Sequence, residues 1–211
     1  MEETTPTKPL KGRPGGIYFI MAALVFLVVG IITGGRFRSD AYSNRDVRKF
    51  EKTLHDKERL LKDELSQLET LFADGSPTEV LDRKSSSYQK LANRHGISIF
   101  FYEKGILKYW SDHSIPLPSR WRPRYARPYL SLRNADYVSV VSQLDQGSLV
   151  GLIEIRTHFP FQNDFLINGY QRDFSLDQEV EIEILEANGS ESIYSEDGTY
   201  LFSLDLSNIV S

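Results

Sequence analysis

The feature that most constrains this chain is a long uncharged stretch near its N-terminus. Between Arg13 and Arg36 no residue carries a charge over 22 positions, and most of these residues are aliphatic or aromatic. As an α-helix with a rise of about 1.5 Å per residue, the stretch is about 33 Å long, which matches the hydrocarbon core of a bilayer. It lacks the polar stripe of a helix that packs in a soluble core. We therefore predict a transmembrane helix at 17–35, preceded by a cytoplasmic N-terminal tail at 1–16.

A cleaved signal peptide is the main alternative for this stretch. The apolar part of a signal peptide is about 7–15 residues long and ends in a small-x-small cleavage site. Here the apolar run is longer and no Ala-x-Ala follows it, although Thr33-Gly34-Gly35 leaves cleavage open. We expect an uncleaved anchor. Basic residues lie on both sides of it, and long flanking domains translocate largely regardless of charge, so the charges leave the orientation open.

A long amphipathic stalk helix is predicted next, at 41–73. No proline or glycine interrupts this region until Gly75 and Pro77. Its apolar residues fall on one face, and six of them define it: Phe50, Leu54, Leu61, Leu65, Leu68 and Phe72. Three of the leucines are a heptad apart, as in a dimeric coiled coil, but Lys57 and Glu64 occupy the complementary core positions. Two interpretations stay open, a homodimer through the stalk and a helix that packs on its own globular domain.

Strand patterns dominate the rest of the chain. A polar segment at 82–87 is expected to be a linker, and apolar or alternating runs follow it. Short turns with glycine separate the predicted strands at 97–102, 106–110, 137–142, 149–155, 179–184, 192–194 and 199–203. Two long irregular connections are expected at about 111–133 and 157–177. A long helix followed by antiparallel hairpins predicts an α+β fold with an antiparallel-sheet domain at 88–211.

Composition limits the classes of function. The absence of cysteine excludes disulfide scaffolds, zinc–thiolate sites and cysteine nucleophiles, and a net charge of -4 argues against a general nucleic-acid binder. No glycine-rich phosphate loop, nucleophile elbow or paired metal-ligand histidines are present. His113 beside Asp112 is expected to be a solvated turn residue rather than a metal ligand. We therefore predict no catalytic residue, no metal and no cofactor within these residues, and leave the enzyme class open.

The most unusual segment interleaves arginines with aromatic residues in the first irregular connection. The candidate ligand-binding residues are Arg120, Trp121, Arg122, Arg124, Tyr125 and Arg127. Guanidinium groups bind anions through bidentate hydrogen bonds and stack on aromatic rings. Three interpretations are open: a proline-stiffened loop whose arginines pair with carboxylates of the same domain, contact with an anionic ligand or lipid headgroups, and contact with nucleic acid. The last ranks lowest because the chain is acidic and the segment short.

A second aromatic group lies in the second irregular connection. We predict that its side chains plug the core beneath a long loop, and a ligand pocket is the alternative. The group consists of Phe159, Phe161, Phe165, Tyr170 and Phe174.

Several segments together carry a resemblance to a known family. They are the hairpin at 97–112 with Ile115-Pro116-Leu117-Pro118 after it, the strand at 152–155 running into 159–163, and the closing hairpin at 194–203. With the apolar helix and the stalk, they resemble the N-terminal transmembrane and periplasmic sensor region of Bacteroidetes-type membrane-bound sensor histidine kinases of two-component systems. The resemblance covers most of the chain, and its motifs are structural hairpins rather than catalytic signatures.

The resemblance implies a PAS-like or Cache-like periplasmic sensor domain, anchored in the inner membrane and followed by a cytoplasmic kinase. This chain departs from that pattern, because it holds no second hydrophobic span, no phosphoacceptor histidine and no ATP-binding boxes. The implied function is a signal-sensing input module that recognises an unknown small-molecule or envelope ligand and passes a displacement through its stalk and membrane helix. The alternative is a non-signalling, single-pass envelope protein that binds cell-wall or membrane-complex partners.

Overall fold

The computed structural model of the chain describes residues 15–161, 167–176, 179–185 and 190–206, with side chains from Arg45 onward. The chain divides into two compact units, Met1–Ser43 and Asn44–Ser211. Among the described residues, none of the helices is both long and apolar enough to cross a bilayer. The predicted span at 17–35 falls on helical residues whose side chains lie outside this description. It stays a prediction.

Two helices precede the strands. Helix α1 runs over Gly15–Asp74 and ends just before Gly75, as the sequence predicts for the stalk. Helix α2 runs over Pro77–His95, with its proline at the first turn, where the missing N–H costs nothing. It ends at Gly96, whose φ of 62° is the left-handed conformation that glycine adopts without strain and whose N–H donates to the carbonyl of Ala92.

The predicted linker at 82–87 is wrong, because these residues lie inside α2. Its buried residues, Val80, Leu81 and Tyr88, recur at helical spacing on one side, while most of the segment between them is exposed. Three consecutive serines have modest helix propensity, but packing of the apolar face on the domain outweighs propensity. The local polarity of the segment was therefore misleading.

Six strands form the larger sheet, called sheet A. They are β1 (Ile97–Glu103), β2 (Ile106–Trp110), β3 (Tyr129–Ser131), β4 (Ala135–Leu144), β5 (Gly147–Thr157) and β6 (Gly169–Tyr170). Their order is β2-β1-β5-β4-β3, with β6 paired to the end of β5, and every pairing is antiparallel. Two of the predicted hairpins, β1–β2 and β4–β5, lie in this sheet and are confirmed. Strand β3 was not predicted, because it is short and lies in a proline-containing segment.

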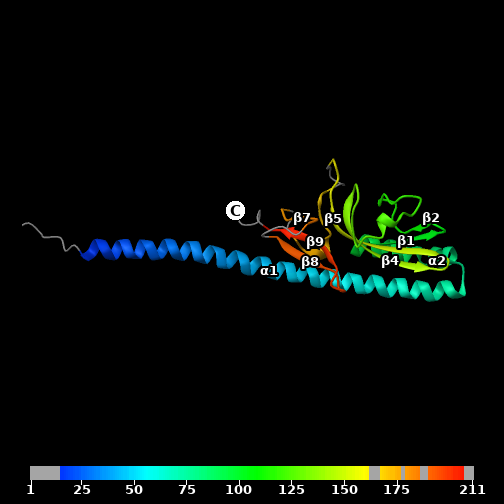
Figure 1. Cartoon of the computed structure of the whole chain (residues 1–211), viewed down its shortest axis with the longest axis horizontal. Coiled ribbons are helices and arrows are strands. Elements are labelled where there is room, and N and C mark those ends of the chain that lie inside the picture. Colours follow the sequence, from blue (N-terminus) through cyan, green and yellow to red (C-terminus); the bar gives the residue numbers. More distant parts are fainter. Residues whose placement is uncertain (1–14, 162–166, 177–178, 186–189, 207–211) are drawn as a thin grey trace, which may run out of the picture. The chain divides into compact units, whose positions relative to one another are not determined.

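Three strands form a smaller antiparallel sheet, called sheet B. They are β7 (Glu181–Glu183), β8 (Glu191–Tyr194) and β9 (Tyr200–Asp205), in the order β7-β9-β8. Within the second unit, β7, β8 and β9 lie beside an earlier part of α1 than the hairpins of sheet A do (Figure 1). The chain therefore has the predicted α+β fold with antiparallel sheets.

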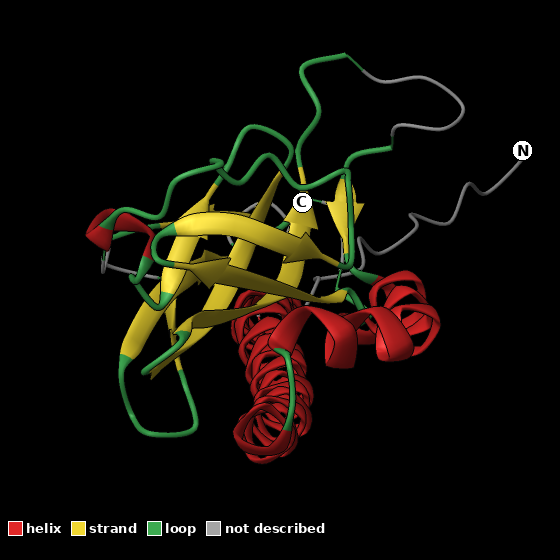
Figure 2. Ribbon diagram, turned by 90° about the vertical axis from the view of Figure 1, so that its right-hand side faces the viewer, coloured by secondary structure: helices red, strands yellow, loops and turns green. Residues whose placement is uncertain are grey.

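The two helices cover one face of sheet A, as Figure 2 shows. Side chains of β1 alternate between two apolar clusters, with Phe101 on the helix side and Phe100 and Tyr102 on the other side. The apolar face of α1 belongs to the helix-side cluster through Phe50, Leu54, Leu61, Leu65, Leu68 and Phe72. The stalk thus packs on its own domain, as one interpretation of the sequence predicted. A homodimer stays a prediction and would have to use other residues of α1.

The second aromatic group behaves in two ways. Phe174, in the short helix η2 (Arg172–Phe174), is buried and stacks on Phe50 of α1 with ring centroids 4.4 Å apart. Tyr170 packs against the same cluster. Phe161, in contrast, is 85% exposed, so its predicted role as a core plug is wrong. Phe165 lies outside the described residues.

Candidate functional site

The arginine-rich segment forms the connection between β2 and β3. Backbone contacts hold its first part against the β1–β2 hairpin. Arg120 forms an isolated antiparallel β-bridge with Ile106, and the backbone N–H of Trp121 donates to the carbonyl of Gly105 at 2.8 Å. The ring of Trp121 lies 5.1 Å from that of Tyr102 and covers the loop side of sheet A. Trp121 therefore serves packing.

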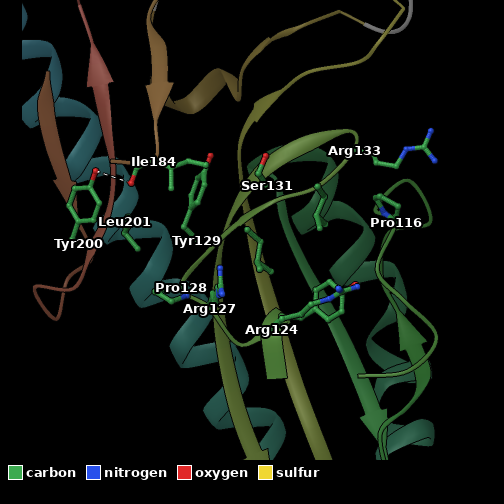
Figure 3. Close-up of a pocket in the computed structure, with 13 residues that line it drawn as sticks. Pro116, Arg124, Arg127, Pro128, Tyr129, Ser131, Arg133, Ile184, Tyr200 and Leu201 are labelled. Atoms are coloured by element: carbon green, nitrogen blue, oxygen red, sulfur yellow. Dashed lines mark hydrogen bonds between the residues drawn. The ribbon is translucent and has the colours of Figure 1, made fainter. Parts of the chain in front are cut away.

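The second part of the segment lines a groove of about 820 Å³ (Figure 3). Arg124 and Tyr125 belong to the short helix η1 (Pro123–Tyr125), and Arg127 follows it. Three of the six candidate residues thus come together. Arg120 and Arg122 are exposed and do not line this groove.

The remaining walls of the groove come from both sheets. Strand β3 and its neighbours contribute Tyr129 and Arg133 on the side of sheet A. Sheet B contributes Tyr200 and Leu201 of β9, and Ile184 lies just after β7. In Figure 3, Tyr200 and Leu201 lie on one side of the groove and Pro116 and Arg133 on the other, and the Tyr200 hydroxyl donates to the carbonyl of Ile184 at 3.3 Å.

The charged side chains that line the groove are all positive. Its lining includes Arg124, Arg127 and Arg133, and among the described residues that line it none is acidic. Within the described part of the chain, none of these three guanidinium groups forms an ion pair with a carboxylate. Arg124 instead donates to the hydroxyl of Tyr125 at 2.8 Å and lies over its ring. The arrangement can hold a negatively charged group beside aromatic rings.

A smaller polar pocket of about 270 Å³ adjoins the groove and shares Tyr129, Ser131 and Ile184 with it. Here the guanidinium of Arg156, on β5, donates to both carboxylate oxygens of Glu181, on β7, at 2.7 and 3.2 Å. This bidentate pair joins sheet A to sheet B. Burial raises the pKa of Tyr129, so its hydroxyl stays protonated.

A set of contacts fastens sheet B to the stalk through the β8–β9 turn. The buried carboxylate of Glu58 accepts a hydrogen bond from the backbone N–H of Glu196 at 2.8 Å. The Glu196 side chain pairs with Arg59 and Lys62 at 3.3 and 3.1 Å. Burial raises the pKa of Glu58, because its charged form is desolvated. We call these contacts the turn clasp.

The turn itself is stiffened from within. The Asp197 carboxylate accepts hydrogen bonds from Ser195 and Thr199, which lower its pKa to about 2. Beside the turn, the Nε2–H tautomer of His55 on α1 donates to the carbonyl of Tyr194 at 3.0 Å. The turn clasp therefore joins a stiff turn to a helix face defined by residues 55, 58, 59 and 62.

A second polar link ties α1 to the ends of α2 and η2. Lys57 is buried, and its ammonium donates to Asp173 at 2.6 Å and to the carbonyl of His95. Burial lowers the pKa of Lys57. Lys57, one of the two charged residues at core positions of the predicted heptad, thus has specific partners. The other, Glu64, accepts a hydrogen bond from the hydroxyl of Tyr88 at 3.4 Å.

Sequence reasoning missed Arg133 and the whole contribution of sheet B to the groove. Arg133 follows the last predicted arginine by six residues, beyond a strand that was not recognised. In the described residues there is also no group of three or more acidic or histidine side chains placed to hold a metal ion. Comparison of the chain with protein-family models, with curated proteins and with solved structures finds no match in any of the three.

Proposed function

We propose that this chain is the extracytoplasmic input module of a membrane-bound two-component sensor histidine kinase, with a PAS-like or Cache-like sensor domain. The resemblance of its hairpins to that family supports the proposal. The antiparallel sheet in the order β2-β1-β5-β4-β3, with two helices on one face, is compatible with it. In this proposal the segment at 17–35 anchors the chain in the inner membrane and the sheets lie in the periplasm.

One observation carries the functional part of the proposal. The groove has walls from both sheets, and one of these sheets is clasped to the stalk helix. Strand β9 supplies Tyr200 and Leu201 to the groove, and the turn that precedes β9 supplies Glu196 to the turn clasp. A ligand that touches both sheets therefore acts on a strand that is connected directly to α1.

The proposed mechanism follows from this connectivity. An occupied groove favours one arrangement of sheet B against sheet A, and the turn clasp carries this preference to residues 55–62 of α1. Such coupling requires that the ligand bind two arrangements with different affinity. The Arg156–Glu181 pair crosses the same boundary between the sheets, so we propose that it sets the resting arrangement.

The kinase assignment can be tested on the native protein. An antibody raised against residues 76–211 would detect the protein in membranes of its source, where its mass can be measured. A band far above 24.2 kDa would support a longer receptor. A band at 24.2 kDa would refute the kinase assignment.

The second candidate function is an anchored envelope protein without signalling output. Two apolar side chains, Phe161 at 85% and Leu185 at 78% exposure, are the first places where such a partner contact would be sought. This candidate predicts the 24.2 kDa band and co-purification with a cell-wall or membrane-complex partner.

A further inference from the structure

We infer that the ligand of the arginine-lined groove is a small organic anion, with one acidic group joined to an apolar or aromatic body. The inference rests on the proposed function in one respect, since it names the ligand class of the same groove. It excludes two simpler occupants, an inorganic anion and a neutral apolar molecule.

The requirement for an acidic group comes from the charges of the lining. Arg124 and Arg127 lie in the loop, and Arg133 extends outward at the rim beyond β3 (Figure 3). Among the described residues that line the groove there is no carboxylate beside them. Planar guanidinium groups match carboxylate, sulfonate and phosphate oxygens in bidentate geometry. A neutral ligand would gain nothing from the positive potential of these arginines.

The requirement for an apolar body comes from the rest of the lining. All three arginines are exposed, and exposed ion pairs contribute little because water and salt screen them. An inorganic anion would therefore bind weakly. Between the arginines lie apolar and aromatic side chains, and Ile184 is 61% exposed at the sheet B wall. A body that covers these side chains gains the hydrophobic contribution that the ion pair alone lacks.

The dimensions suit a free small molecule. A groove of about 820 Å³ falls within the range of about 300–1,000 Å³ that is typical of small-molecule sites. Arg124 and Arg127 do not lie on a flat surface, since Tyr200 and Leu201 stand on one side of them and Pro116 on the other (Figure 3). A lipid headgroup in a bilayer is the competing source of the same chemistry, and the experiment separates the two.

The test uses the full chain in nanodiscs of zwitterionic lipid, with empty nanodiscs as the blank. Isothermal titration would compare 2-naphthoate, its neutral analogue 2-naphthamide, and acetate, which carries the charge without the body. We expect 2-naphthoate to bind at least tenfold more tightly than either of the others. Equal affinity for naphthoate and naphthamide, or for naphthoate and acetate, would overturn the inference.

Variants locate the binding in the groove. Arg124→Gln and Arg127→Gln should each weaken naphthoate binding at least threefold and together more than tenfold, with unchanged circular dichroism. The matched control is Arg122→Gln, an exposed arginine of the same segment that does not line the groove. An equal loss in the control would refute the assigned site. Anionic phosphatidylglycerol vesicles that displace naphthoate, while phosphatidylcholine vesicles do not, would replace the small molecule by a lipid headgroup.

A separate readout keeps the ligand class distinct from the sensor function. The chain has no cysteine, so spin labels at Lys52→Cys on α1 and Lys108→Cys on β2 report the distance between stalk and sheet A. A pair at Lys52 and Gln67, both on α1, is the control. Naphthoate binding without a change in the first distance would leave the ligand class standing and refute the proposed coupling. A change in the distance between the labels at positions 52 and 108, with an unchanged distance in the control pair, would support both the ligand class and the proposed coupling.

Discussion

Replacing Gly151 with alanine places a methyl group in space that the stalk helix already occupies. Gly151 lies in β5, and an added Cβ would be 2.3 Å from Cδ1 of Leu61, 2.7 Å from its Cδ2 and 2.8 Å from its Cγ. Carbon atoms in contact are about 3.5–4.0 Å apart, so the Leu61 side chain and β5 must separate by about 1 Å or more. Leu61 is fully buried and cannot turn toward solvent.

The size of the effect follows from this geometry. Overpacking of a core costs about 1–3 kcal/mol, and we expect about 2–3 kcal/mol because three side-chain atoms of Leu61 are affected. Leu61→Ala alone leaves a cavity and should cost about 2–5 kcal/mol. In the double variant the clash is absent and the new methyl group fills part of the cavity. The double variant should therefore be no less stable than Leu61→Ala, with a coupling energy of about 2 kcal/mol.

Urea unfolding of the full chain in detergent, followed by tryptophan fluorescence, measures all four free energies of the cycle. Both tryptophans, Trp110 and Trp121, lie in the second unit and report on its unfolding. Additive costs in the double variant would refute the contact between Gly151 and Leu61. A change in the free energy of unfolding below about 0.5 kcal/mol for Gly151→Ala would also refute this contact, because ordinary surface substitutions have effects of that size.

Three further predictions concern the polar contacts of the stalk. Burial raises the pKa of Glu58, so the folded chain binds a proton at this residue more readily than the unfolded chain does. The free energy of unfolding therefore falls as the pH rises above about 4.3, the ordinary pKa of a glutamate. Glu58→Gln should therefore gain stability relative to the wild type from pH 4 to pH 8 in urea unfolding, and a difference independent of pH would contradict this. Lys57→Met should cost about 1–3 kcal/mol, because the carbonyl of His95 loses its buried donor, while Asp173 is 30% exposed and keeps its contact with His95. Lys62→Met, at a more exposed position, should cost about 0–1 kcal/mol, and similar costs for the two variants would count against the buried link. Glu181→Gln removes an exposed partner and should change global stability by less than about 1 kcal/mol but speed hydrogen exchange in β7, and unchanged exchange would refute its role between the sheets.

The hairpins of this fold could be predicted because their signals are local. The β1–β2 turn needs positive φ at Lys104 and Gly105, and the sequence places a glycine there between two strand-like runs. The apolar face of the stalk was equally visible from its spacing. In contrast, the sequence analysis did not predict α2, because the residues at 82–87 are polar and suggested a linker. The helical spacing of its apolar residues becomes clear only over all 19 residues of the helix.

The candidate site was predictable only in part, for a physical reason. Arg124, Tyr125 and Arg127 stand out in the sequence by composition, but their partners Ile184 and Tyr200 come about 60–75 residues later, on another sheet. No local pattern indicates which strand packs beside a loop. Lys57 was interpreted only as an interruption of the heptad, and its partners, the carbonyl of His95 and the carboxylate of Asp173, lie too far along the chain for a local pattern to indicate them.

The packing of the last described strand on the stalk has a consequence for how the protein is made. Phe50 contacts Phe174 and Phe202, and these residues follow it by more than 120 positions. At a synthesis rate of about 5–20 residues per second, the stripe around Phe50 waits about 8–30 s for β9 to emerge. Throughout that interval the apolar face of α1 around Phe50 is exposed to solvent. A nascent chain that stalls before β9 should therefore be a preferred substrate for chaperones and quality-control proteases.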